Sequence, residues 1–121
     1  MKLCSIAVST IMALLPIVGA AQPGRFTTNL GEGNTSCGEW TDKRKAEPGR
    51  VIPEASWILG YLTAASNFRS SNTPDFTSGV RGSATDHWVD SYCATHPLDD
   101  IQAAAQALAV ELIQRARRNS N

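Results

Sequence analysis

The sequence predicts an all-α fold, a small four-helix bundle held by one disulfide bond after a cleaved signal peptide. Three observations lead to this prediction. No segment alternates apolar and polar residues with a period of two, whereas apolar residues recur at spacings of three and four in several stretches. The chain begins with an apolar leader, and beyond it only two cysteines remain, Cys37 and Cys93.

The start of the chain has the features of a signal peptide over residues 1–21. Lys2 supplies a positive charge, residues 3–18 are almost entirely apolar, and the three residues that follow are small, as signal peptidase requires. The apolar run is shorter than the ~20 residues that a spanning helix needs, although an uncleaved anchor is the alternative. We expect cleavage near Ala21 and a periplasmic or secreted protein whose mature form has no membrane span.

Charge and cysteine usage restrict the classes of protein. Loss of Lys2 leaves ten Lys and Arg against eleven Asp and Glu, a formal net charge of −1. This balance argues against nucleic acid and anionic membranes as partners. In an exported chain Cys37 and Cys93 are expected to pair, and the loop-entropy model assigns such a bridge ~4 kcal/mol. Two unpaired buried thiols are the alternative.

The mature chain is expected to consist of a flexible N-terminal arm and one helical domain. Residues 22–34 are polar, rich in glycine and without a period, which is typical of a flexible segment. The helical domain then covers residues 35–121, a length that fits a single domain.

The first helix is expected at residues 35–46, with Cys37 and Trp40 on it, and a Pro-Gly pair follows its end. Its basic triplet at 43–45 is flanked by acidic residues, which favours a solvated face over a binding patch.

The second helix is expected at residues 53–68. Pro53 suits the first turn, and apolar residues recur at spacings of three and four as far as Phe68. Gly60 lies inside this helix, where glycine costs ~1 kcal/mol relative to alanine. We therefore expect a neighbouring helix to approach closely at Gly60.

Residues 69–82 form the one long irregular segment, and such segments in a small domain are often functional or mobile. Phe76 and Val80 are expected to attach the segment to the core. A connection without a role is an equal alternative. The candidate interaction residues in and beside this segment are Asn67, Arg69, Asp75, Phe76 and Arg81.

The third helix is expected at residues 84–95. Ser83 and Asp86 have the spacing of a capping box at its start, and Pro97 ends it because the residue before proline avoids the helical conformation.

The fourth helix follows Pro97 and is the clearest of the four. Asp99 and Asp100 are expected in its first turn, an apolar stripe continues over residues 101–113, and three arginines follow at 115–118. Acidic residues first and basic residues last is the order that the helix dipole favours.

Aromatic residues occupy apolar positions of the first three helices, which favours a shared aromatic core over a ligand cage. These residues are Trp40, Trp57, Tyr61, Trp88 and Tyr92.

The sequence contains no recognisable motif for catalysis or for a cofactor. Cys93 and His96 are three apart, but a disulfide bond would remove the nucleophile. His87 and Asp90 share a helical face near Asp86, which is a weak signal for a metal, and His96 is better suited to capping a helix end. We therefore expect no catalytic residue, no metal, no cofactor and no enzymatic activity.

The layout resembles that of the HdeA-type acid-stress chaperones. The pattern consists of Cys37-x-x-Trp40, then Trp57-x-x-Gly60-Tyr61, then Trp88-x-x-x-Tyr92-Cys93 and Pro97-Leu98. The resemblance implies a small helical periplasmic stress chaperone that binds other proteins, and it leaves a homodimer open.

A second resemblance is to the Tai-type immunity proteins. It consists of Gly60-Tyr61-Leu62, of Tyr92 through His96-Pro97, and of an alanine-rich helix ending in Glu111-Leu112. This resemblance implies a protein that binds and blocks a specific effector enzyme.

The two hypotheses differ in their response to acid. At strongly acid pH the carboxylates are neutral and the mature charge rises from −1 to about +12, from ten Lys and Arg and two His. Repulsion would then loosen the packing or separate a dimer. The chaperone hypothesis predicts this loosening, whereas the immunity hypothesis predicts tight 1:1 binding at neutral pH.

Overall fold

A computed structural model of the chain describes residues 29–120. Over this range the fold is all-α, as predicted, with four α-helices, two 3-10 helices and one isolated β-bridge. The α-helices are α1 (Cys37–Ala46), α2 (Ile52–Asn67), α3 (Gly82–Thr95) and α4 (Ile101–Asn119). The 3-10 helix η1 (Gly31–Asn34) precedes α1, and η2 (Pro48–Val51) lies between α1 and α2. Residues 1–21, where the sequence predicts a signal peptide, lie outside the described residues. Within 29–120 no helix is both long enough and apolar enough to cross a membrane.

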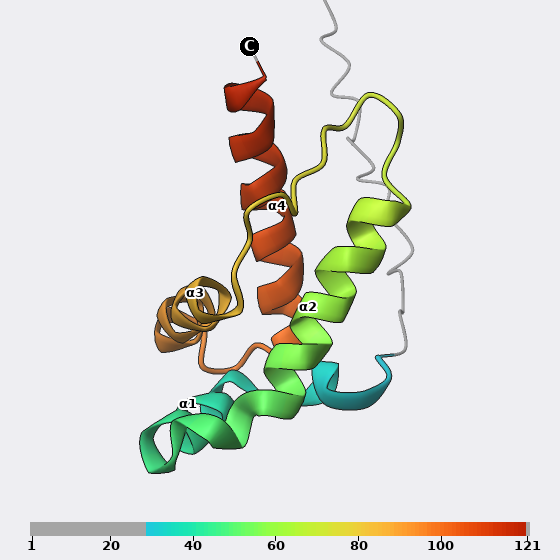
Figure 1. Cartoon of the computed structure of the whole chain (residues 1–121). Coiled ribbons are helices and arrows are strands. Elements are labelled where there is room, and N and C mark those ends of the chain that lie inside the picture. Colours follow the sequence, from blue (N-terminus) through green and yellow to red (C-terminus); the bar gives the residue numbers. More distant parts are fainter. Residues whose placement is uncertain (1–28, 121) are drawn as a thin grey trace, which may run out of the picture.

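The helices are arranged around a pair formed by α2 and α4. These two helices lie side by side and run in the same direction, while α1 lies near their starting ends and α3 packs beside α4 (Figure 1). The irregular segment after α2 crosses the C-terminal half of α4 before it enters α3 (Figure 1). The segment leads from the end of α2 to α3, and α3 in turn leads to the start of α4.

The starts of α1 and α4 are held next to each other by backbone hydrogen bonds. The amide of Cys37 donates to the carbonyl of Asp99 at 2.8 Å, and the amide of Ile101 donates to the carbonyl of Thr35 at 2.9 Å. Asp100 is the N-cap of α4, and its carboxylate accepts from the amide of Ala103 at 2.8 Å. The two aspartates therefore lie directly before the helix, and the prediction that they occupy its first turn is wrong.

The predicted disulfide bond between Cys37 and Cys93 is present, with an S–S distance of 2.07 Å. Both cysteines are buried, and the bond joins the first turn of α1 to the last turn of α3. The prediction that it links the first helix to the third is confirmed.

The core is formed by one continuous cluster of buried side chains from every α-helix, from η2 and from the irregular segment. Its members are Cys37, Trp40, Val51, Ile58, Leu62, Phe76, Val89, Cys93, Ile101, Ala104, Ala105, Leu108, Ala109 and Leu112. The prediction that Phe76 and Val80 attach the irregular segment is confirmed, because Phe76 is buried and Val80 packs against the cluster.

Two predictions for α2 are wrong. Phe68 is the C-cap of the helix and is 90 % exposed, so it does not belong to the apolar face. Gly60 does not mark a close approach either, since a Cβ built there meets no atom within 4 Å. The 3.6-residue period places Phe68 on the inner face only if the helix continues, and the helix ends before it.

The capping box predicted for α3 does not form. The N-cap is Arg81, no side chain caps the helix, and α3 begins at Gly82, before both Ser83 and Asp86. The carboxylate of Asp86 faces inward instead, where its Oδ1 atom is buried without a hydrogen-bond partner among the described residues.

Part of the expected flexible arm has a regular conformation, since residues 31–34 form η1. Gly33 in η1 is buried under the indole ring of Trp57, and a Cβ at this glycine would lie 2.5 Å from Cζ2 of that ring. The indole Nε1 also donates to the carbonyl of Leu30 at 2.7 Å. An aromatic side chain of α2 therefore holds this segment, while residues 22–28 lie outside the described range.

Candidate functional site

A groove runs between the irregular segment and the C-terminal half of α4, and we call it the loop groove. Its deeper part has a volume of about 440 Å³. It is bounded by residues 74–81, by the first two turns of α3, and by the part of α4 that begins at Leu108. A shallower hollow of about 580 Å³ adjoins it and shares Pro74 and Ser120 with it. The deeper part has the size of many ligand-binding pockets.

The deeper part of the loop groove combines an apolar floor with a polar rim. Phe76, Leu108 and Leu112 line it and are almost fully buried, so they pack into the core beneath. Arg81 and Arg115 line the rim and are exposed. Such a combination is typical of sites that bury an apolar group and orient it by polar contacts.

The structure brings together three of the five residues predicted as an interaction loop. Asp75, Phe76 and Arg81 line the loop groove, whereas Asn67 and Arg69 do not. The guanidinium of Arg69 donates to the carbonyls of Ser66 and Thr73, so Arg69 closes the turn at the end of α2.

Asp75 fixes the conformation of the irregular segment. Its Oδ1 atom accepts from the hydroxyl and the amide of Thr77, at 2.7 and 2.9 Å, and from the hydroxyl of Ser66 at 3.0 Å. These hydrogen bonds, those from Thr77 first, lower the pKa of Asp75 below its ordinary value. The segment is therefore tied back to α2 by its own polar groups, and the groove is preformed.

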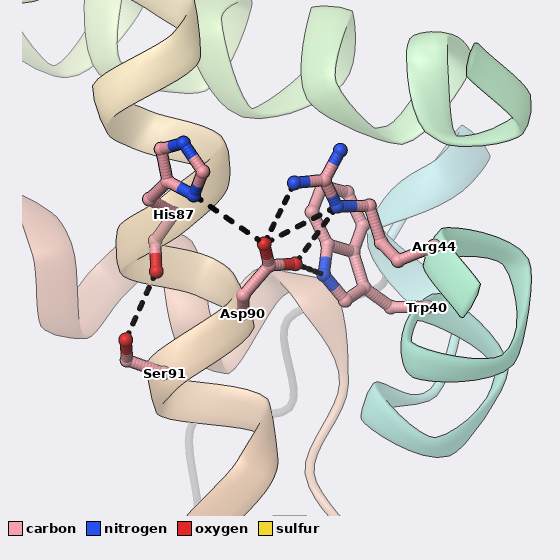
Figure 2. Close-up of polar contacts among 5 residues, drawn as sticks. All are labelled: Trp40, Arg44, His87, Asp90 and Ser91. Carbon is pink, nitrogen blue, oxygen red and sulfur yellow. Dashed lines mark hydrogen bonds and ion pairs between the residues drawn. The ribbon is translucent and has the colours of Figure 1, made fainter. Parts of the chain in front are cut away.

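A second polar cluster joins α1 to α3 and is centred on Asp90. Its carboxylate accepts from the indole Nε1 of Trp40 at 2.8 Å and from the guanidinium of Arg44 at 2.7 and 2.9 Å (Figure 2). Trp40 is fully buried, so its indole N–H depends on this carboxylate. His87 lies at the edge, 3.9 Å from the same carboxylate (Figure 2).

Another ion pair joins α1 to α2. Glu54 is 1 % exposed, and its carboxylate lies 2.6 Å from the ammonium group of Lys43, which also lies 2.7 Å from Glu39. The hydrogen bonds to Glu39 and Glu54 raise the pKa of Lys43 above its ordinary value. We call the Lys43–Glu54 and Arg44–Asp90 pairs together the α1 junction.

The pKa values of the two aspartates on α3 shift in opposite directions. Burial alone would raise the pKa of Asp90, but the hydrogen bonds from Arg44 and Trp40 outweigh it, and the net pKa is lowered. Burial raises the pKa of Asp86, which has no such donor. Asp90 therefore stabilises the fold as an anion, while the charge on Asp86 opposes folding.

The expected solvated face at 43–45 is thus only partly correct, since Lys43 and Arg44 make the α1 junction and Lys45 is exposed. The acidic residues that flank this triplet in the sequence gave no reason to expect these partners, because Glu54 and Asp90 lie on other helices. The one signal in the sequence was the expected core position of Trp40, because the indole N–H of a buried tryptophan needs a hydrogen-bond acceptor.

The five predicted core aromatics do not form a single cluster. Only Trp40 is buried, and the others form two separate stacks at the edge of the core. Trp57 stacks on Tyr61 with ring centroids 5.6 Å apart, and Trp88 stacks on Tyr92 at 5.5 Å.

The second stack continues to the end of α3. The ring of His96 stacks on Tyr92 at 4.2 Å, and its Nδ1 atom lies 3.0 Å from the carbonyl of Tyr92, as expected of a residue at a helix end. The phenol of Tyr92 donates to Asp99 at 2.6 Å, which raises the pKa of Tyr92 to about 12. The indole of Trp88 donates to Glu111 at 2.7 Å.

In the part of the chain that the structure describes, no three His, Cys, Asp or Glu side chains are grouped as a metal site would require. His87 contacts Asp90, but that carboxylate already accepts from Arg44 and Trp40. Comparison of the chain with protein-family models, with curated proteins and with solved structures finds no match.

Proposed function

We propose that this chain is an exported, non-enzymatic interaction protein that binds other proteins through the loop groove. The observation that carries this proposal is the apolar floor of Phe76, Leu108 and Leu112 beneath a polar rim in a preformed hollow of about 440 Å³. Large apolar side chains inserted into such hollows supply most of the affinity of protein interfaces. Export is supported by the disulfide bond between Cys37 and Cys93, since such bonds persist in oxidising compartments.

We infer further that the protein acts as a stress chaperone of the HdeA type, and the α1 junction supports this mode. Both of its pairs need an ionised carboxylate, and both hold α1 against the rest of the fold. The contribution of Asp90, whose folded pKa is lowered, is present above its ordinary pKa of ~3.9 and is lost as the pH falls through the folded value. Asp86 has the opposite sign and offsets part of this loss.

Acid would therefore weaken the contacts of α1 without releasing it, because the disulfide bond still joins Cys37 to Cys93. Apolar surface on η2 and α3, the elements that α1 contacts, would then become accessible to unfolding client proteins.

An inhibitor or immunity protein that blocks a specific effector enzyme is the second candidate. It is favoured by a different observation, namely that hydrogen bonds to Asp75, which lower the pKa of this carboxyl, preform the loop groove at neutral pH. A preformed site loses little conformational entropy on binding, which favours high affinity at neutral pH.

The experiment that tests the proposal measures aggregation of an acid-sensitive client enzyme by light scattering, at neutral pH and below about pH 3, where carboxylates are protonated. Ala84 lines the loop groove and is exposed, so Ala84→Trp fills the groove; the control Ala64→Trp adds the same side chain to an exposed position on α2 that does not line it. Circular dichroism verifies that both variants are folded.

The chaperone mode predicts suppression of aggregation in acid by the wild-type protein and by Ala64→Trp, with a reduced effect for Ala84→Trp. Saturable 1:1 binding to one enzyme at neutral pH, without suppression in acid, would select the inhibitor instead. Equal behaviour of Ala84→Trp and Ala64→Trp in both assays contradicts a role for the loop groove.

A further inference from the structure

We propose that the loop groove binds an acidic segment of a partner protein, with carboxylates at the arginines of the rim and one large apolar side chain in the deeper hollow. This inference rests on the proposed function and specifies the chemistry of the partner at neutral pH, where an acidic segment is negatively charged.

The charge of the loop groove is positive, although the mature chain is nearly neutral. Arg81 and Arg115 line the deeper part and Arg117 lines the adjoining hollow, whereas the only carboxylate that lines either is Asp75. Glu111 pairs with Arg115 beside the groove, so three guanidinium groups and two carboxylates give a local net charge of +1. In residues 29–120 Asp75 makes no ion pair with these arginines, and its Oδ1 atom accepts hydrogen bonds from Ser66 and Thr77.

Two of the three guanidinium groups are free to bind a partner. Arg115 lies 3.1 Å from Glu111, one turn away on α4. The side chains of Arg81 and Arg117 make no hydrogen bond or ion pair with any other residue between 29 and 120. Guanidinium groups bind carboxylates in a bidentate manner, so an acidic segment satisfies them better than a neutral one.

The apolar floor of the loop groove favours a partner that also carries one large apolar side chain. Phe76, Leu108 and Leu112 offer a surface that water solvates poorly, and about 440 Å³ accommodates one aromatic or large aliphatic side chain with room for its backbone. The two adjoining hollows share Pro74 and Ser120, so the groove is elongated rather than closed. An extended segment of a protein fits this shape better than a small metabolite.

The probe is a fluorescently labelled peptide with one phenylalanine flanked by four glutamates. Fluorescence anisotropy at neutral pH measures its binding to the mature protein that remains after the expected cleavage near Ala21. The control peptides carry four lysines in place of the glutamates, or alanine in place of phenylalanine. We expect the acidic phenylalanine peptide to bind about tenfold more tightly than either control, with an affinity that falls as salt is added.

Matched variants assign the binding to residues. Arg81→Gln and Arg117→Gln should each weaken binding up to about fivefold, as expected of exposed ion pairs. Ala84→Trp should weaken it by about tenfold or more, since it occupies the apolar hollow. Arg50→Gln is the control, because Arg50 is an exposed arginine on η2 that lines neither hollow, and it should leave affinity unchanged.

Equal affinity for the acidic and basic peptides would overturn the inference, as would arginine variants that behave like Arg50→Gln. Displacement of the acidic peptide by a single-stranded oligonucleotide at lower concentration would overturn it in favour of nucleic acid. If Ala84→Trp still impairs aggregation suppression or 1:1 enzyme binding while the acidic peptide does not bind, the inference fails and the proposed function stands. If Ala84→Trp changes neither of those activities, the proposed function itself fails.

Discussion

Replacement of Asp90 by alanine removes the carboxylate that joins α1 to α3 and should destabilise the protein by about 1–4 kcal/mol. Most of this loss comes from Trp40, whose indole N–H is fully buried and would have no acceptor, at a cost of ~1–3 kcal/mol. The ion pair with Arg44 is partly exposed, with side-chain exposures of 20 % for Arg44 and 34 % for Asp90. Solvent screening therefore limits its contribution to ~0.2–1 kcal/mol.

The assay is urea unfolding at neutral pH, supported by calorimetry. A loss of ~2 kcal/mol should lower Tm by roughly 8–16 °C in a domain of this size. Asp90→Asn retains an acceptor for Trp40 and should lose about 1 kcal/mol or less. Asp42→Ala provides the control, because Asp42 is an exposed aspartate on α1 with no partner in residues 29–120.

The difference between wild type and Asp90→Ala should also depend on pH. Because the folded pKa of Asp90 is lowered, its stabilisation is complete above about pH 4 and decreases as the pH falls further, so the difference should narrow in acid. A loss below about 0.5 kcal/mol at neutral pH, which is the usual range for surface substitutions, would refute the reasoning. So would a difference that stays constant down to the acid limit.

Three further predictions concern local packing and one hydrogen bond. Gly33→Ala should destabilise the protein by roughly 1–3 kcal/mol in urea unfolding, because the new Cβ would lie 2.5 Å from the ring of Trp57; unchanged stability would mean that η1 is not held by that ring. Gly60→Ala should stabilise the protein by ~1 kcal/mol, since its Cβ meets open space, and a loss of stability would instead support a close helix approach. Tyr92, whose pKa is raised to about 12, contributes stability that is complete below its ordinary pKa of ~10 and is lost as the pH rises through 12. Asp99→Asn should therefore shift tyrosinate absorbance to lower pH, and an unchanged titration would show that this hydrogen bond does not control the phenol.

The candidate site could be predicted from the sequence only in part. The irregular segment was recognisable by its length and by the absence of a period, and Phe76 by its isolation as an apolar residue within it. The other wall of the loop groove could not be predicted, because it consists of Leu108, Leu112 and Arg115, which lie on α4 more than 25 residues later in the chain. Their position next to residues 74–81 depends on how α4 packs, which no local pattern specifies.

The partners of the α1 junction were missed for the same reason. Lys43 and Arg44 have acidic neighbours in the sequence, which are enough to predict a solvated face. Their shortest ion pairs are with Glu54 and Asp90 on other helices, at 2.6 and 2.7 Å. Burial decides which carboxylates pair with these basic residues, since a buried carboxylate such as Glu54 must be paired, whereas an exposed one need not be.

The helices and the disulfide bond could be predicted from local sequence patterns. Apolar periodicity, proline and glycine at the ends, and two remaining cysteines are local or compositional signals, and they do not depend on how the helices pack. The tertiary structure alone decided which faces meet, and therefore that Gly33 lies under Trp57, that Phe68 is exposed, and that α2 and α4 run side by side. The physical reason is that helix formation is governed by neighbours within about four residues, whereas packing is governed by the shape of surfaces that the chain brings together from a distance.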